Sequence, residues 1–251
     1  MGTLDRDGVQ IHYDVRGDGA ATPALFTHGF ASSSHAWGPT VDALSATRRC
    51  ITWDVRGHGK TDYPTDAAQY SIPLTLGDME AILDAEGIDR AVLVGHSMGG
   101  YLSLEFVTAH PERVSALVLV GTGPGFRKDE ARAGWNDVCE TYATLFETKG
   151  FAGLRPSAEL DASVHRDVDG LIRVARGILR QHDAGVIDNL ANIAVPTLIV
   201  VGENDKPFRA GSEYMAAKIA DARLVVVPGA PHAPMLTDPD VFLPEVEKFL
   251  A

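Results

Sequence analysis

The sequence predicts an α/β fold: a doubly wound, mostly parallel sheet with helices on both faces. Short apolar runs rich in Val, Leu and Ile recur along the chain without polar alternation, which is typical of strands buried on both faces. Helical patterns alternate with these runs and indicate βαβ units. One long segment lacks strand signals and predicts a helical insertion.

The buried strands are expected where apolar runs are bounded by turn residues. The opening segment 8–17, GVQIHYDVRG, differs because it alternates polar and apolar residues and predicts a strand of an exposed hairpin. The predicted buried strands are 23–27, 50–55, 91–95, 115–121, 197–202 and 222–229.

Helices are expected between these strands. Segment 74–87 places Leu76, Met79 and Ile82 on one stripe and ends at a glycine. Segment 98–109 follows the strand 91–95 and is closed by a proline, and segment 207–220 supplies a third helix. The fourth, 238–250, is predicted to start at Asp238 as N-cap, with a proline in the first helical position.

The insertion covers residues 123–193, so the predicted core consists of residues 1–122 and 194–251. Because the insertion follows strand 115–121, we expect it above the carboxyl edge of the sheet, where ligands bind in such folds. The sequence therefore predicts a helical cap that acts as a lid.

Composition excludes several classes of function. The chain has 251 residues and a formal net charge of −12, which opposes binding to nucleic acid or an anionic membrane. No window approaches the roughly 20 apolar residues of a membrane-spanning helix, and the start has no apolar run of signal-peptide type. We expect a cytoplasmic protein. Nothing in the sequence predicts its oligomeric state.

The two cysteines, Cys50 and Cys139, stand in unrelated contexts. The chain has no CxxC motif and no Cys/His cluster, so a structural zinc site is not expected. We interpret both as free thiols in a reducing compartment.

Ser97 is the predicted nucleophile. The stretch GHSMG, residues 95–99, fits G-x-S-x-G between a strand and a helix, a turn so tight that the serine takes strained backbone angles. This turn also aims the backbone N–H of Met98 toward an oxygen bound beside the serine.

A serine hydroxyl needs a base, and His232 is the best placed of nine histidines. It follows the last strand in the loop PGAPHAP. His96 is expected to point away from Ser97 at so sharp a turn, whereas His28 and His58 lie on loops at the same sheet edge, where backbone hydrogen bonds explain them. The histidines expected at the surface are His12, His110, His165 and His182.

The base needs a carboxylate that holds its tautomer. Asp205, in VVGENDKP, stands just past a strand at the correct edge. Glu203, Asp221 and Asp238 occupy looser positions. The chain order Ser97, Asp205, His232 is the order expected for this kind of turn.

The chain resembles the α/β-hydrolase fold family over nearly its whole length. The resemblance is carried by the motifs FTHGF, DVRGHGKTD, GHSMGG, GENDKP and GAPHAP in that order. It implies that the backbone N–H of Phe30 forms the oxyanion hole together with that of Met98, and that Asp205 and His232 complete a catalytic triad. It implies acyl transfer without cofactor or metal.

The favoured function is hydrolysis of a small-molecule carboxylic ester, or of a lactone, with an acyl-enzyme on Ser97. The alternatives are an enol-lactonase or a hydrolase of carbon–carbon bonds, and, in another class, a binding protein of this fold that lost catalysis. A perhydrolase side activity also remains open. The residues expected to line the substrate pocket are His28, Trp37, Tyr101, Phe126, Trp135 and Tyr142.

Overall fold

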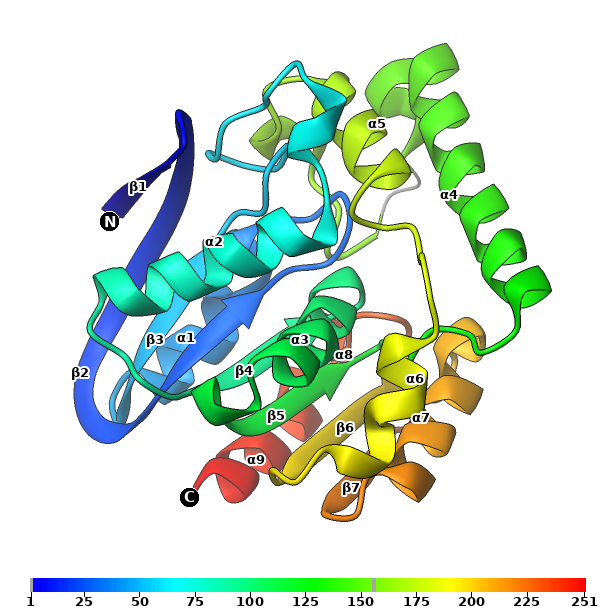
Figure 1. Cartoon of the computed structure of the whole chain (residues 1–251). Coiled ribbons are helices and arrows are strands. Elements are labelled where there is room, and N and C mark those ends of the chain that lie inside the picture. Colours follow the sequence, from blue (N-terminus) through cyan, green and yellow to red (C-terminus); the bar gives the residue numbers. More distant parts are fainter. Residues whose placement is uncertain (1, 155–156) are drawn as a thin grey trace.

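A seven-stranded sheet forms the centre of the computed structural model, which describes residues 2–154 and 157–251 (Figure 1). The order of the strands is β1-β2-β4-β5-β6-β7, with β3 paired to β2. From β4 to β7 all neighbours are parallel. The strands are β1 (Gly2–Arg6), β2 (Val9–Thr27), β3 (Arg48–Trp53), β4 (Ala91–His96), β5 (Val114–Val120), β6 (Thr197–Gly202) and β7 (Ala222–Val227).

The long strand β2 meets β3 twice. Tyr13 lies opposite Trp53 and Arg16 opposite Cys50, whereas Thr27 also lies opposite Trp53. The first half of β2 is therefore antiparallel to β3, and the second half is parallel to it. Figure 1 shows the bend of β2 between the two halves. The first half also forms the predicted hairpin with β1, through a turn at residues 7 and 8 with positive φ at both positions.

Helices cover both faces of the sheet, with α2 and α3 on one face and α1, α8 and α9 on the other (Figure 1). Their bounds are α1 (Gly38–Leu44), α2 (Ile72–Ala85), α3 (Met98–Ala109), α4 (Asp129–Lys149), α5 (Val168–Arg176), α6 (Gly185–Asn189), α7 (Lys206–Lys218), α8 (Pro234–Thr237) and α9 (Pro239–Leu250).

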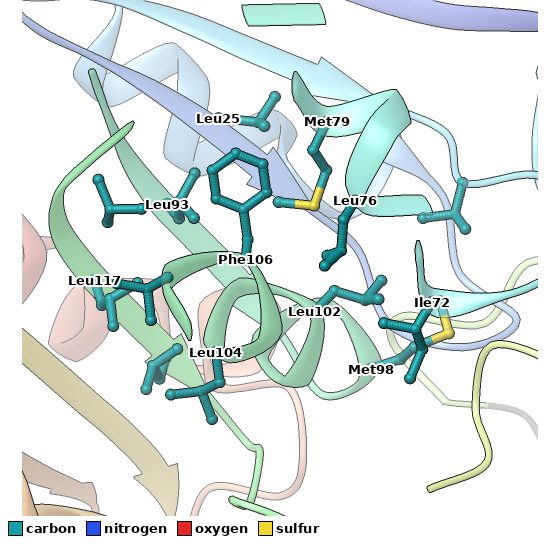
Figure 2. Packing of buried hydrophobic residues seen from close by; sticks show 14 of the residues in the cluster. Leu25, Ile72, Leu76, Met79, Leu93, Met98, Leu102, Leu104, Phe106 and Leu117 are labelled. Atoms are coloured by element: carbon teal, nitrogen blue, oxygen red, sulfur yellow. The ribbon is translucent and has the colours of Figure 1, made fainter. Parts of the chain in front are cut away.

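The core has one layer on each face of the sheet. Alternate residues of a strand point to opposite faces, so Leu25 and Leu93 face α2 and α3, whereas Phe26 packs with the layer that includes Phe242 of α9. Figure 2 shows Phe106 of α3 between the strand leucines and α2. A fully buried aromatic side chain of this kind stabilises a fold by about 3–5 kcal/mol relative to alanine.

The insertion contributes α4, α5 and α6. Helices α4 and α5 pack on each other at one side of the molecule (Figure 1), and their shared apolar cluster also includes Ala31 from the loop after β2. Helix α5 ends at Arg176, and the C-cap residue Gly177 lies so close to Tyr70 that a Cβ there would collide with its backbone carbonyl. The division into a core and a cap at residues 123–193 stays an interpretation.

The predicted fold class is confirmed: a mostly parallel sheet with helices on both faces. A strand is present at each position predicted for a buried strand, and the segment 23–27 is the last part of β2. The prediction of full burial is wrong for 222–229, because β7 lies at the edge of the sheet and is mostly half-buried. None of the helices in the described residues combines the length and the apolar character that a membrane span requires.

Candidate active site

Ser97 stands at the turn from β4 to α3 with φ 52° and ψ −115°, a region that non-glycine residues rarely adopt. The neighbouring glycines permit this turn. A Cβ on Gly95 would collide with the carbonyl of Gly99, and a Cβ on Gly99 would collide with the carbonyl of Thr27. The N–H of Ser97 donates to the carbonyl of Val120 at 2.8 Å and holds the turn against β5. Strain of this kind costs about 1–3 kcal/mol and clusters at functional sites.

Asp205 and His232 come together from the ends of β6 and β7. The Nδ1 of His232 lies 2.8 Å from Oδ2 of Asp205. Because an ionised carboxylate only accepts hydrogen bonds, Nδ1 carries the proton and Nε2 keeps its lone pair for another proton. Gly121 packs directly against this pair and has a φ of 53°. A Cβ at this position would lie 2.7 Å from the carbonyl oxygen of His232.

The ring of His232 lies close to two other rings. His96 contacts it with a centroid distance of 4.7 Å, and Phe208 stacks on it at 4.9 Å with an interplanar angle of 26°. The Nε2 of His96 donates to the carbonyl oxygen of His232 at 3.2 Å. Burial lowers the pKa of His96 well below its usual value, so a neutral ring lies beside His232.

Ser97 and His232 are linked through shared neighbours, although within the described residues their side chains share no hydrogen bond. His96 contacts His232 and directly precedes Ser97. Phe208, which stacks on His232, lines the same cavity as Ser97. Hydrogen bonds between nucleophile and base often tighten only in the substrate complex. The roles of Ser97, Asp205 and His232 stay predictions.

The loop after β2 lies against the serine. A Cβ on Gly29 would lie 2.8 Å from Nδ1 of His96 and 3.3 Å from Cβ of Ser97. Among the loop and turn hydrogen bonds of the described residues, none is donated by the backbone N–H of Phe30 or of Met98. Met98 is also the first residue of α3, where the helix dipole favours negative charge. These two N–H groups stay the predicted oxyanion hole.

The prediction that His28 lines the pocket is wrong. Its side chain is fully buried, and its Nδ1 donates to the carbonyl of Gly29 at 2.7 Å while its Nε2 accepts from the N–H of Val55 at 3.0 Å. In a trans peptide the C=O and the N–H point in opposite directions. The bond to the Gly29 carbonyl therefore fixes the direction of the Phe30 N–H.

A cavity of about 340 Å³ opens beside Ser97. Its walls are mostly apolar and come from the core and from the insertion. Three predicted pocket residues, Tyr101, Phe126 and Trp135, line it. Burial raises the pKa of Tyr101, so its hydroxyl stays neutral. The other lining residues are Met98, Thr122, Gly123, Pro124, Gly125, Ile178, Leu179, Gln181, Pro207, Phe208, Ala210 and Gly211.

The pocket prediction is also wrong for Trp37 and Tyr142. Trp37 is fully buried in the layer beneath the sheet, with its ring 5.6 Å from that of Phe26. Tyr142 of α4 is 42% exposed, and its ring centroid lies 5.7 Å from that of Phe30. Neither residue lines the cavity.

Sequence reasoning missed Phe208 and Gln181 as cavity residues. The one signal for Phe208 was its position directly after the motif GENDKP, which contains the predicted partner of His232. Gln181 is 8% exposed, and Asn136 of α4 holds its backbone with two hydrogen bonds of 2.9 Å. Nothing in the local sequence indicates this contact.

The chain belongs to the alpha/beta hydrolase family. The model of that family matches residues 24–245. These residues include the turn at Ser97 and the loops that carry Asp205 and His232. The predicted fold and the predicted class, a hydrolase, are thereby confirmed. Among the described residues, no group of three or more His, Cys, Asp or Glu side chains is arranged to hold a metal ion.

Several relatives and solved structures match almost the full length of the chain. A protein of Variovorax paradoxus (strain S110), provisionally named carbamate hydrolase RutD, is 31% identical over 96% of each chain. The enol-lactonase from Burkholderia xenovorans LB400 is 25% identical, covers 99% of each chain and superposes with a TM-score of 0.81. Est816, an enzyme that degrades N-acyl homoserine lactones, is 27% identical, covers 99% of this chain and 100% of its own, and has a TM-score of 0.76.

Proposed function

We propose that the protein hydrolyses small carboxylic esters through an acyl-enzyme on Ser97. The observation that carries this proposal is the hydrogen bond of 2.8 Å from His232 to Asp205. The ring of His232 stacks on Phe208, which lines the same cavity as the strained Ser97. An imidazole oriented by a carboxylate is the base that activates a serine nucleophile.

In the first half of the reaction, Nε2 of His232 takes the proton of the Ser97 hydroxyl while Oγ forms a bond to the acyl carbon. The carbonyl oxygen becomes an oxyanion, which the N–H groups of Phe30 and Met98 stabilise. The ester C–O bond then breaks, and His232 returns the proton to the leaving alcohol. Asp205 stabilises the imidazolium throughout.

In the second half, His232 takes a proton from water, and the resulting oxygen nucleophile attacks the acyl carbon. The bond to Ser97 Oγ breaks, Ser97 regains its proton from His232, and the carboxylic acid leaves. The mostly apolar walls of the cavity, including Leu179, Trp135 and Phe208, suit an apolar acyl or alcohol group.

Lactone hydrolysis is the second candidate, because two lactone-cleaving enzymes superpose on almost the whole chain. The chemistry is identical except that the leaving alcohol stays tethered to the acyl group. Comparing kcat/KM for a γ-lactone with that for the open ester of equal carbon number separates the two candidates.

The test is hydrolysis of p-nitrophenyl acetate and butyrate by the native protein and by Ser97→Ala. The account predicts turnover that falls by at least about 10³-fold in the variant. The matched control is Ser45→Ala, which removes an exposed hydroxyl at the end of α1 and leaves the rate unchanged. Equal rates for Ser97→Ala and native protein would remove Ser97 as nucleophile. Tight ligand binding with negligible turnover would instead indicate a binding protein.

The substrate is proposed to be a small molecule that meets the enzyme in the cytoplasm. The buried free thiols of Cys50 and Cys139 support a reducing compartment. Perhydrolysis and carbon–carbon hydrolysis stay predictions.

A further inference from the structure

Two buried histidines bind the backbone of a single residue, Ala31, which directly follows Phe30. The N–H of Ala31 donates to Nε2 of His58 at 3.0 Å. The carbonyl oxygen of Ala31 accepts from Nε2 of His165 at 3.0 Å. Ala31 has φ 56° and is 1% exposed, so its backbone is held in a left-handed conformation that alanine rarely adopts.

The two histidines come from different parts of the chain. His58 belongs to the loop after β3, and His165 precedes α5 inside the predicted cap. His165 was expected at the surface, as was His12, and both are buried. Their burial corrects that prediction, and it gives the cap a direct hydrogen bond to the loop that follows β2.

The hydrogen-bond partners fix the tautomer of each ring. Nε2 of His58 accepts from an N–H and therefore carries no proton, while its Nδ1 donates to the carbonyl of Arg56 at 3.2 Å. Nε2 of His165 faces a carbonyl and therefore carries the proton. Its Nδ1 accepts from the N–H of Gly59 at 3.4 Å. Each ring is neutral in this arrangement.

The surroundings favour the neutral form. The ring of His58 lies 4.8 Å from that of His28 and 5.6 Å from that of His165. Asp54 is also near, but its carboxylate accepts from the N–H groups of Ser34 and Lys60. Burial lowers the pKa of His58 and of His165. Below these pKa values, a protonated His58 would lose the lone pair that holds Ala31.

We propose that His58 and His165 are positioning residues that lock Ala31 and thereby aim the N–H of Phe30 at the oxyanion. This inference rests on the proposed ester hydrolysis. Phe30 lies between a peptide fixed by His28 and a residue fixed by these two rings, and Gly29 packs directly against Ser97. A displacement of Ala31 therefore moves the predicted oxyanion donor. A misplacement of about 1 Å in such a group costs up to about 10²-fold in rate.

The test compares leucine and glutamine at both positions, with p-nitrophenyl butyrate as substrate. Leucine fills the space without hydrogen bonding, whereas glutamine places an acceptor or a donor near the position of Nε2. We expect kcat of His58→Leu and His165→Leu to fall by about 10- to 100-fold with KM nearly unchanged, and His58→Gln and His165→Gln to recover most of the rate.

Inhibition by a trifluoromethyl ketone is the second readout. Addition of Ser97 Oγ to its carbonyl carbon creates an oxyanion, so the inhibition constant should rise in parallel with the loss of kcat. His110→Leu is the matched control: it removes a partly buried histidine beside Phe106 at the far end of α3, and its kcat should match that of the native protein.

Three outcomes are decisive. If Ser97→Ala is inactive but the folded leucine variants keep native kcat and inhibitor affinity, the positioning role is overturned while the proposed function stands. If Ser97→Ala keeps native activity, the proposed function itself fails. If a leucine variant does not fold, histidine ¹⁵N spectra of the native protein decide: a proton on Nε2 of His58, or on Nδ1 of His165, overturns the proposal, and the opposite pattern supports it.

Discussion

His232 donates from Nδ1 to Oδ2 of Asp205 over 2.8 Å, and the side chain of Asp205 is only 3% exposed, whereas that of His232 is 29% exposed. The carboxylate is thus shielded while the imidazole keeps an open edge. This asymmetry suits an orienting acid and a base that must reach a substrate.

Asp205→Asn should keep the fold and lose the rate. An asparagine amide turned toward Nδ1 of His232 donates a hydrogen bond and favours the tautomer with the proton on Nε2, which can no longer act as base. We expect kcat for p-nitrophenyl butyrate to fall by about 10³- to 10⁴-fold, comparable to the trypsin example from which this magnitude is known. Asp240→Asn, in the first turn of α9, is the control. A loss below about tenfold for Asp205→Asn would contradict the assignment of the acid.

Trp135→Ala should shift the preference toward longer acyl chains. Trp135 lines the cavity, and its Nε1 donates to the carbonyl of Leu179 at 2.8 Å. Removing the indole enlarges the apolar space, and each additional buried CH₂ contributes about 0.8 kcal/mol. The ratio of kcat/KM for p-nitrophenyl octanoate to that for acetate should rise. Trp135→Phe, which keeps a ring, should change this ratio less, and an unchanged ratio in both variants would place the acyl group elsewhere.

Stability should decrease as the solution is acidified below about pH 6.5. Burial lowers the pKa of His28, His58, His96 and His165 in the folded protein. At acidic pH the unfolded chain then binds more protons than the folded chain. The free energy of unfolding is therefore highest above the unfolded pKa. As the pH is lowered, it decreases by up to about 1.4 kcal/mol per pH unit for each of these histidines.

Urea unfolding at about pH 7.5, 6.5 and 5.5 measures this dependence. His58→Gln removes one of the titrating groups and should make the slope shallower than in the native protein. An identical slope in the two proteins would show that His58 is protonated equally in the folded and unfolded states.

Neither cysteine should react in the native protein. Burial raises the pKa of Cys50 to about 11 and that of Cys139 to about 12, and both thiols are fully buried. At about pH 8 the reactive thiolate is therefore scarce and inaccessible. Ellman's reagent should detect no thiol before urea is added and both afterwards. Rapid reaction of a native thiol would contradict the packing around it.

Local patterns predicted the features that depend on local sequence. The strand 91–95, the glycines around Ser97 and the helix 98–109 are contiguous, and the structure forms β4 and α3 at the same place. The loops that carry Asp205 and His232 could be predicted at one edge of the sheet because both directly follow apolar strands.

Features that depend on contacts between residues far apart in the sequence could not be predicted from local patterns. The sequence predicts Trp37 as a pocket residue, yet its ring packs against that of Phe26. His165 lies in a polar stretch, and contacts with residues distant in the sequence, including Ala31 and His58, bury it. Asp238 occupies the predicted N-cap position, but its carboxylate accepts from the hydroxyl of Thr237 at 2.6 Å and makes no cap hydrogen bond.

The most direct test is to identify the covalent intermediate. The native protein is mixed with p-nitrophenyl butyrate, quenched in acid within milliseconds and digested, and the peptide that contains residues 95–99 is examined by mass spectrometry. We predict a butyryl group on Ser97, in an amount equal to the burst of p-nitrophenol. A burst with the acyl group on any other residue, or steady turnover by the Ser97→Ala variant at the native rate, would contradict the account.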